Sequence, residues 1–330
     1  MIFKRLFSAA LSALPPRLFL AAVAMMVVLF GAGFTALNYA ANDFGLWRHR
    51  GSIRIWALEK TSKYLLAHRY VPENFNAIMI GSSVSDNLDT RKIEGYRVYN
   101  LSMSGGNITE TGAAAQKYLE APGEKALLIV SLYPYLTKNS GMKSFQIDKG
   151  EVIGSLFSMI PINIWLAKIK HYAGIGGKAL EQSEAGWNYF DLPRDVRKTD
   201  DMAAALRREL EERKKKHDAA PVKAQIDPVA VAELDALLKL ARSKGVRIAA
   251  YYHPQFGPKF DLEAATGEWA DYRAAMEKIF APGEIILNMN GPEYAALRND
   301  PDAYYDGGHL TQRGAGQVLQ ALNRALSARD

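Results

Sequence analysis

The pattern of hydrophobic and polar positions divides the chain into two unequal parts. Residues 18–37 form an uncharged apolar run, LFLAAVAMMVVLFGAGFTAL, about the length of helix that crosses a bilayer core. A soluble helix of that length normally carries a polar stripe, and this run has none. From Ala77 onward, short apolar runs alternate with stretches of helical periodicity. The first part predicts a membrane helix, and the second predicts a folded domain of the α/β class.

The alternation after Ala77 predicts a particular kind of sheet. Strands separated by amphipathic helices indicate a parallel sheet covered by helices on both faces, a three-layer α/β/α sandwich. In such sheets ligands bind beyond the carboxyl ends of the strands, so candidate chemistry should follow directly after the apolar runs. The predicted strands are 77–80, 97–101, 126–132, 246–252 and 284–287, and the predicted helices lie near 108–120, 228–244, 261–280 and 312–328.

Two segments fall outside this alternation. Residues 40–74 predict a juxtamembrane helix, with Ile55, Leu58, Leu65 and Leu66 on one face. The stretch 133–227 interrupts the strand–helix pattern, with an apolar and aromatic first half and a charged second half. That second half includes RRELEERKKKHD at 207–218, which is typical of a solvated helix. The insertion would suit a lid or a surface for a partner.

Composition and charge exclude several classes of protein. Apolar residues make up 48% of the 330 residues, enough for a full core, and there is no cysteine. The chain therefore has no disulfide, Cys-ligated zinc, iron–sulfur cluster or thiol nucleophile. The net charge is +6, but residues 1–60 hold seven basic and two acidic residues. The basic excess therefore flanks the apolar run, which favours a membrane surface over nucleic acid as the partner.

The flanking charges also predict the orientation of the membrane helix. Lys4, Arg5 and Arg17 precede the run and favour a cytoplasmic N-terminus, although a second basic cluster at 48–54 weakens the asymmetry. A cleaved signal peptide is the alternative, but its apolar region would be shorter and the nearest cleavage candidate, 39–41, is poor. We expect an uncleaved, single-pass anchor in the inner membrane, with the rest of the chain periplasmic.

These expectations divide the chain into four segments: a cytoplasmic N-terminus at 1–16, a transmembrane anchor at 17–39, a juxtamembrane helix or linker at 40–75, and a domain at 76–330 with the insertion at about 133–227.

Three short motifs at predicted strand ends carry the candidate chemistry. Gly81-Ser82-Ser83 follows the first strand, where glycine permits a tight turn and a helix start would favour negative charge developing at Ser83. Gly105-Gly106 follows the second strand and could point backbone amides into a site, as an oxyanion hole requires. Alone, the first motif also fits a helix cap and the second an ordinary turn.

The third motif lies near the C-terminus. Asp306 stands three residues before His309, close enough to orient an imidazole that acts as general base to a serine. Thr311 could cap the final helix. Alone, this motif also fits an Asp-Gly-Gly turn beside a surface histidine.

Taken in order, the three motifs resemble the SGNH/GDSL hydrolase superfamily over roughly residues 76–328, excluding the insertion. The resemblance implies that Ser83 is the nucleophile, that Asp306 and His309 complete a catalytic triad, and that the amides of Ser83 and Gly105 form the oxyanion hole. The family's aspartate after the first glycine is Ser82 here, which is similar to membrane-anchored members such as the DltD-like proteins of teichoic acid D-alanylation.

One family motif is missing. The family's third block is Gly-x-Asn-Asp, whose Asn donates to the oxyanion, whereas this chain has Ser131-Leu132-Tyr133-Pro134 at the matching strand end. Asn139 is nearby but is not a convincing replacement. Loss of such a donor typically costs about 10²–10³ in rate. This departure suggests a slow hydrolase, or a transferase whose partner completes the site.

Three further residues are expected to border the substrate: Asn107, Tyr133 and His253. His253 lies at the end of the fourth predicted strand, and the alternative for it is a packed, hydrogen-bonded histidine. The histidines show no metal-ligand spacing, so we expect no metal and no cofactor.

The leading hypothesis is a membrane-anchored extracytoplasmic serine acyltransferase or esterase that acts on cell-envelope polysaccharide, in the manner of O-acetylation. The resemblance implies an acylated donor, a glycan acceptor and a multi-span membrane acyltransferase as partner. A stand-alone SGNH esterase or deacetylase is the second hypothesis. A catalytically silent SGNH-like module that binds glycan or scaffolds an assembly is the third.

Overall fold

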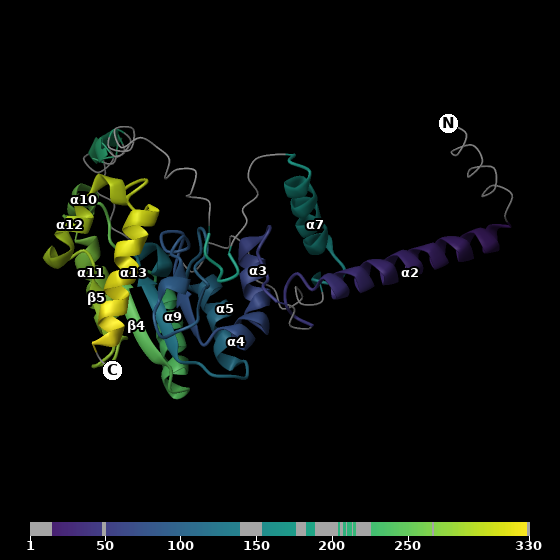
Figure 1. Ribbon diagram of the computed structural model, residues 1–330, viewed down its shortest axis with the longest axis horizontal. Coiled ribbons are helices and arrows are strands. Elements are labelled where there is room, and N and C mark those ends of the chain that lie inside the picture. The colour runs from purple at the N-terminus through teal and green to yellow at the C-terminus, as the bar shows by residue number, and fades with distance from the viewer. Residues whose placement is uncertain are drawn as a thin grey trace.

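A parallel five-stranded sheet lies inside the folded domain, away from α2 (Figure 1). The computed structural model describes residues 15–47, 51–138, 154–175, 183–188, 226–265 and 267–328, together with 204, 207–208, 210–212 and 214–215. All neighbouring strands pair in parallel in the order β2-β1-β3-β4-β5, which confirms the expected α/β class. The strands are β1 (Ala77–Ile80), β2 (Val98–Asn100), β3 (Leu127–Leu132), β4 (Arg247–Tyr252) and β5 (Ile285–Asn288).

Alternate residues of the strands pack into two separate cores. Ile78, Leu128 and Ile248 belong to the first core, whereas Met79 and Ile129 belong to the second. Because successive side chains of a strand point to opposite faces, the sheet is covered on both sides. This double burial explains why β1 is a continuous apolar run and why β3 is apolar except for Ser131.

The helices divide between these two faces. The first core includes side chains of α3 (Glu59–Leu66), α4 (Tyr70–Asn74), α5 (Ile108–Glu120), α9 (Pro228–Ser243) and α11 (Glu268–Glu277). The second core is closed by α12 (Ala295–Arg298) and α13 (Gln312–Ser327). The remaining described helices are α2 (Pro16–Ala41), α7 (Met159–Tyr172), α10 (Gly257–Ala264) and the short η1 (Thr90–Lys92), η2 (Pro134–Thr137), η3 (Pro292–Tyr294) and η4 (Pro301–Ala303).

The chain order of the strands creates a switch point beside β1. The chain passes from β1 to β2 on one side and then returns to β3 on the other. In open parallel sheets this reversal leaves a crevice at the carboxyl ends of the two central strands. The residues after β1, including Ser83, therefore start at this crevice.

Two predicted helices differ from the structure. The stretch 261–280 is divided into α10 and α11 because Gly267 adopts φ 81°, a left-handed conformation that ends one helix and precedes the next. The juxtamembrane segment is helical only from Glu59, where α3 begins. Before it, Gly45 and Gly51 have positive φ, and these turns break the helix that was predicted over 40–74.

Helix α2 projects away from the sheet domain (Figure 1). It is long and apolar enough to cross a membrane, and none of its most apolar 18-residue window is buried in the protein. Asn42 ends it in a left-handed conformation, with its backbone N–H donating to the Asn38 carbonyl.

Two described pieces of the insertion contact the elements around it. Helix α7 lies near the C-terminal end of α2. Residues 183–188 extend along β2, where the Asn100 N–H donates to the Ala185 carbonyl at 2.7 Å and the Asn188 N–H donates to the Asp86 carbonyl at 2.8 Å. The described residues between 204 and 215 are helical and mostly exposed, and the rest of 201–225 lies outside the described residues.

A substitution at Gly186 would measure how tightly the 183–188 segment packs against β2. It has φ 78°, and a Cβ there would lie 2.5 Å from the Asn100 carbonyl oxygen and 2.6 Å from the Tyr99 ring. We expect Gly186→Ala to lower the unfolding free energy by about 1–3 kcal/mol, because strain and overpacking add. Gly316→Ala is the control, since that Cβ would meet nothing within 4 Å in α13. Equal urea midpoints for the two variants would contradict the prediction.

Candidate active site

Ser83 is the one residue of 80–90 that is not buried. Ser82 and Ser85, the other serines of this segment, are 2% and 0% exposed. The segment forms turns and not a helix, so the predicted helix dipole at Ser83 is absent. Ser83 nevertheless lies just after the carboxyl end of β1 and is partly exposed.

A buried asparagine explains why the Ser83 turn does not become a helix. The Asn100 side-chain amide donates to the carbonyls of Ser85 at 2.8 Å and Leu88 at 3.1 Å. The Ser85 hydroxyl donates to the Ser82 carbonyl at 3.1 Å. Side chains thereby satisfy carbonyls that a helix would have used. The turn is also closely packed, since a Cβ on Gly81 would lie 2.2 Å from the Ser85 Oγ.

The last loop places Asp306 and His309 in line with Ser83. His309 Nε2 lies 3.0 Å from Ser83 Oγ, and His309 Nδ1 lies 2.8 Å from Asp306 Oδ2. Asp306 Oδ1 accepts the backbone N–H groups of Gly308 at 2.8 Å and His309 at 2.7 Å. The carboxylate thus fixes both the loop and the tautomer that leaves Nε2 free to accept the serine proton.

These contacts keep Asp306 ionised. Burial alone would raise its pKa, but the His309 side chain and the two backbone amides outweigh that effect and hold the pKa of Asp306 well below its usual range. A permanently ionised carboxylate is the form that orients an imidazole and stabilises an imidazolium.

His253 has a different position from the one expected. Its ring is fully buried, so it does not border a substrate. Nε2 lies 2.9 Å from the Gly308 carbonyl and donates to it. This hydrogen bond ties the Asp306–His309 loop to the end of β4. Burial is the largest cause that lowers the pKa of His253 to about 3, so the ring is neutral. His253 is therefore the packed, hydrogen-bonded histidine of the alternative interpretation.

The loop after β2 carries Gly105. This glycine has φ 58° and is exposed, a conformation that favours glycine. In the described chain, neither the Ser83 nor the Gly105 amide donates to another protein group. The loop is joined to the Ser83 turn, because the Ser104 hydroxyl donates to Asp86 Oδ2 at 2.6 Å. Amides without a protein partner are the kind of donor that an oxyanion hole requires.

Helix α3 binds the same loop through three charged side chains. Lys60 Nζ donates to the Gly105 carbonyl at 3.0 Å and to Glu110 at 2.8 Å. Lys63, fully buried, donates to the Ser102 carbonyl and pairs with Glu59 at 3.1 Å. Glu59 also accepts the Ser104 N–H at 3.3 Å. The segment next to the apolar helix therefore sets the position of the Gly105 loop.

The other two residues expected to border the substrate have structural contacts. Asn107 caps α5, because its side chain accepts the Glu110 N–H. Tyr133 is partly exposed, and its ring lies beside those of Trp269 and His253, at 6.2 and 6.4 Å between centroids. Tyr133 follows β3, the strand end at which the expected Asn motif is missing, and Asn139 lies outside the described residues. Thr311 caps α13, as predicted.

Several residues of the site were missed by sequence reasoning. Lys259 is 2% exposed, and a Cβ on Gly307 would lie 2.2 Å from its Cδ, so it packs under the Asp306–His309 loop. Lys60 and Lys63 look like residues of an ordinary solvated helix, and no pattern distinguishes Lys259 or Asn100. The described residues contain no group of three or more His, Cys, Asp or Glu arranged to hold a metal.

Comparisons with known proteins add little to this geometry. No protein-family model and no curated protein matches the chain. Among solved structures, one match is described as "The structure of a putative platelet activating factor from Streptococcus pneumonia". It is 12% identical, covers 82% of this chain and 90% of its own, and has a TM-score of 0.40. A likeness this weak carries no argument about fold or function.

The Lys60 contact predicts a measurable effect on Ser83. We expect Lys60→Met to slow the reaction of Ser83 with a fluorophosphonate by about 10–100-fold, because the Gly105 amide loses its position. The rate is followed by mass spectrometry on the full chain. Lys239→Met is the control, since Lys239 is an exposed lysine paired with Asp235 on α9. Equal rates for both variants would rule out a positioning role for Lys60.

The buried, neutral ring of His253 makes the unfolding free energy depend on pH. Its folded pKa lies below the ordinary value of 6.5, so the unfolded chain binds more protons between the two values. The stability from the neutral ring is therefore present above about pH 6.5 and falls as the pH decreases towards 3. We expect the urea midpoint of His253→Gln to fall less steeply over this range than that of the unchanged chain. Parallel curves would show that His253 does not cause the loss.

Proposed function

We propose that this chain is a membrane-anchored serine enzyme of the SGNH type that transfers or hydrolyses acyl groups on cell-envelope polysaccharide. The observation that carries the proposal is the hydrogen-bonded series Ser83–His309–Asp306, with distances of 3.0 and 2.8 Å. A serine, a base and an orienting carboxylate in this geometry are the parts needed to activate a hydroxyl nucleophile. The motif order and the sheet covered on both faces support the three-layer SGNH fold.

The proposed reaction proceeds through an acyl-enzyme. Ser83 Oγ attacks the ester carbonyl carbon while His309 Nε2 takes its proton. The amides of Ser83 and Gly105 hold the resulting oxyanion. When the intermediate collapses, the ester C–O bond breaks and His309 returns the proton to the leaving alcohol. Water or a sugar hydroxyl then attacks the acyl-enzyme, with His309 as base, and Ser83 is released.

The apolar α2 supports the proposed location. A helix that can cross a bilayer, followed directly by the site domain, would hold the chemistry at the membrane surface. The basic residues before the helix favour a cytoplasmic N-terminus, which would place the domain outside the inner membrane. Cell-envelope glycans and their acylated donors are the substrates available there.

The missing third donor supports a transferase over an efficient hydrolase. Two backbone amides can hold an oxyanion, but the family's Asn is replaced by Tyr133 in this chain. A site that lacks one donor reacts slowly with water, and a membrane acyltransferase that delivers the acyl group could complete it. A stand-alone esterase remains the second candidate, because the Ser83–His309–Asp306 geometry alone suffices for hydrolysis.

The proposal is tested by labelling the full chain in detergent with a fluorophosphonate and locating the modified residue by mass spectrometry. We expect labelling at Ser83, loss of labelling in Ser83→Ala, and a reduction of about 10³–10⁴ in rate in His309→Ala and Asp306→Asn. Labelling at Ser82 or Ser85 would contradict the assignment of the nucleophile.

A second measurement separates transfer from hydrolysis. The isolated acyl-enzyme is mixed with water alone or with an oligosaccharide acceptor, and the acylated products are counted. Faster loss of the acyl group with the acceptor supports the transferase. Loss at the same rate, with free acid as the product, supports the esterase. A folded chain that forms no acyl-enzyme with any ester would favour the silent binding module.

A further inference from the structure

Helix α7 exposes an apolar face that the sheet domain does not cover. Its sequence, MIPINIWLAKIKHY, contains no acidic residue. Ile164 packs into the first core, but Leu166 is 48% exposed, Ile169 57% and Met159 64%. Met159, Leu166 and Ile169 lie on one helical face because their spacing follows the turn of a helix. Two exposed polar residues, Asn163 and Lys170, border this face. A lysine at such a position buries its aliphatic stem and extends its charge to the headgroups.

The residues just before α7 contact α2 inside the apolar run. The Phe157 ring packs edge-on against Phe34, at 5.7 Å between centroids. It also lies 3.8 Å from where a Cβ on Gly31 would be. Phe34 and Gly31 precede Leu37, the last residue of the uncharged run, by about 5 and 9 Å along the helix at 1.5 Å per residue. If α2 crosses a bilayer, Phe157 therefore lies at hydrocarbon depth.

Polar contacts mark the level at which the chain leaves this apolar zone. The side-chain amide of Asn38 donates to the Leu156 carbonyl at 2.9 Å, which satisfies a backbone group that would otherwise face lipid. Lys168 of α7 pairs with Asp43, just beyond the end of α2. The two helices are thus fixed to each other on both sides of the boundary.

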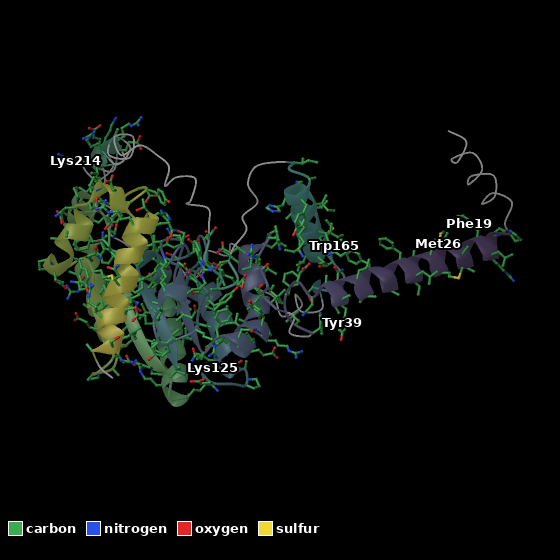
Figure 2. All side chains as sticks on the ribbon, in the orientation of Figure 1. Phe19, Met26, Tyr39, Lys125, Trp165 and Lys214 are labelled. Atoms are coloured by element: carbon green, nitrogen blue, oxygen red, sulfur yellow. The ribbon has the colours of Figure 1, made fainter. Side chains whose placement is uncertain are left out.

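The orientation and the aromatic residues fit the same boundary. Helix α7 runs across the direction of α2 (Figure 1), and Trp165 lies near the Tyr39 end of α2 (Figure 2). A helix across the membrane normal lies in the plane of the interface. Trp and Tyr concentrate at that level in membrane proteins. Tyr39 packs against Trp47 at 5.8 Å between centroids, and Trp56 packs against Tyr172, the last residue of α7, also at 5.8 Å.

We propose that α7 is a second membrane element, which lies in the outer interface of the bilayer with Met159, Leu166 and Ile169 against the acyl chains. The inference rests on the proposed membrane span of α2. Its occupant is lipid, because the exposed face continues the apolar surface of α2 and the helix carries no negative charge. The insertion thereby holds the site domain against the membrane through a second attachment.

The experiment uses the absence of cysteine. Single-cysteine variants Leu166→Cys and Ile169→Cys are made in the full chain, labelled with a nitroxide and reconstituted in vesicles of phosphatidylcholine and phosphatidylglycerol. Val28→Cys in α2 is the reference for lipid. Val229→Cys, 58% exposed on α9, is the reference for water. Electron paramagnetic resonance then compares the access of oxygen, which enters lipid, with that of a water-soluble nickel chelate.

We expect the labels at 166 and 169 to be reached by oxygen more than by nickel, as at 28 and unlike at 229. Nickel access at 166 and 169, with the label at 28 still in lipid, would overturn the proposal while leaving the span intact. Protection from both reagents would show that protein covers the face, which also overturns it. Nickel access at 28 would overturn the membrane span itself, together with this inference, whereas labelling of Ser83 tests the chemistry separately.

Discussion

The carboxylate of Asp306 is the contact on which the rest of the site depends. One oxygen accepts two backbone amides of its own loop, and the other orients the His309 ring. All these donors lie within three residues of Asp306, so one carboxylate holds the whole loop in place. Two residues from other parts of the chain also hold the loop. His253 donates to the Gly308 carbonyl, and the Asn87 side chain donates to the Leu310 carbonyl. The base therefore stands opposite Ser83 before any substrate arrives.

Local patterns predicted most of the sheet domain. Strands buried on both faces are read from continuous apolar runs, and β1 begins and ends where the sequence indicated. The helix over 261–280 was wrong in one respect, because the left-handed Gly267 divides it, and glycine inside a periodic stretch only weakly indicates a break. The helix over 40–74 was wrong before Glu59, because the turns at Gly45 and Gly51 give no strong signal in an amphipathic stretch.

The candidate triad could be predicted because its spacing is local or lies at strand ends. Its supports could not, because they join residues far apart in the chain. Lys60 reaches Gly105 across 45 residues, and His253 reaches Gly308 across 55. His253 packs inside the protein and does not border a substrate, because its ring is buried. A single sequence does not show whether the side chain of a histidine at a strand end is buried or exposed. The same holds for Lys259, whose place under the last loop depends on tertiary packing.

The contact between α3 and the Gly105 loop ties the candidate site to the segment that follows the apolar helix. The chain passes from the end of α2 at Ala41 to Glu59 through segment 42–58 only, and α3 is bound to the site by charged side chains. If α2 is the proposed membrane anchor, a serine held this way would stay close to the plane in which that anchor diffuses. Under the proposed function, encounters would then be two-dimensional, and an acceptor attached to the same surface would be favoured over one free in solution by effective concentration alone.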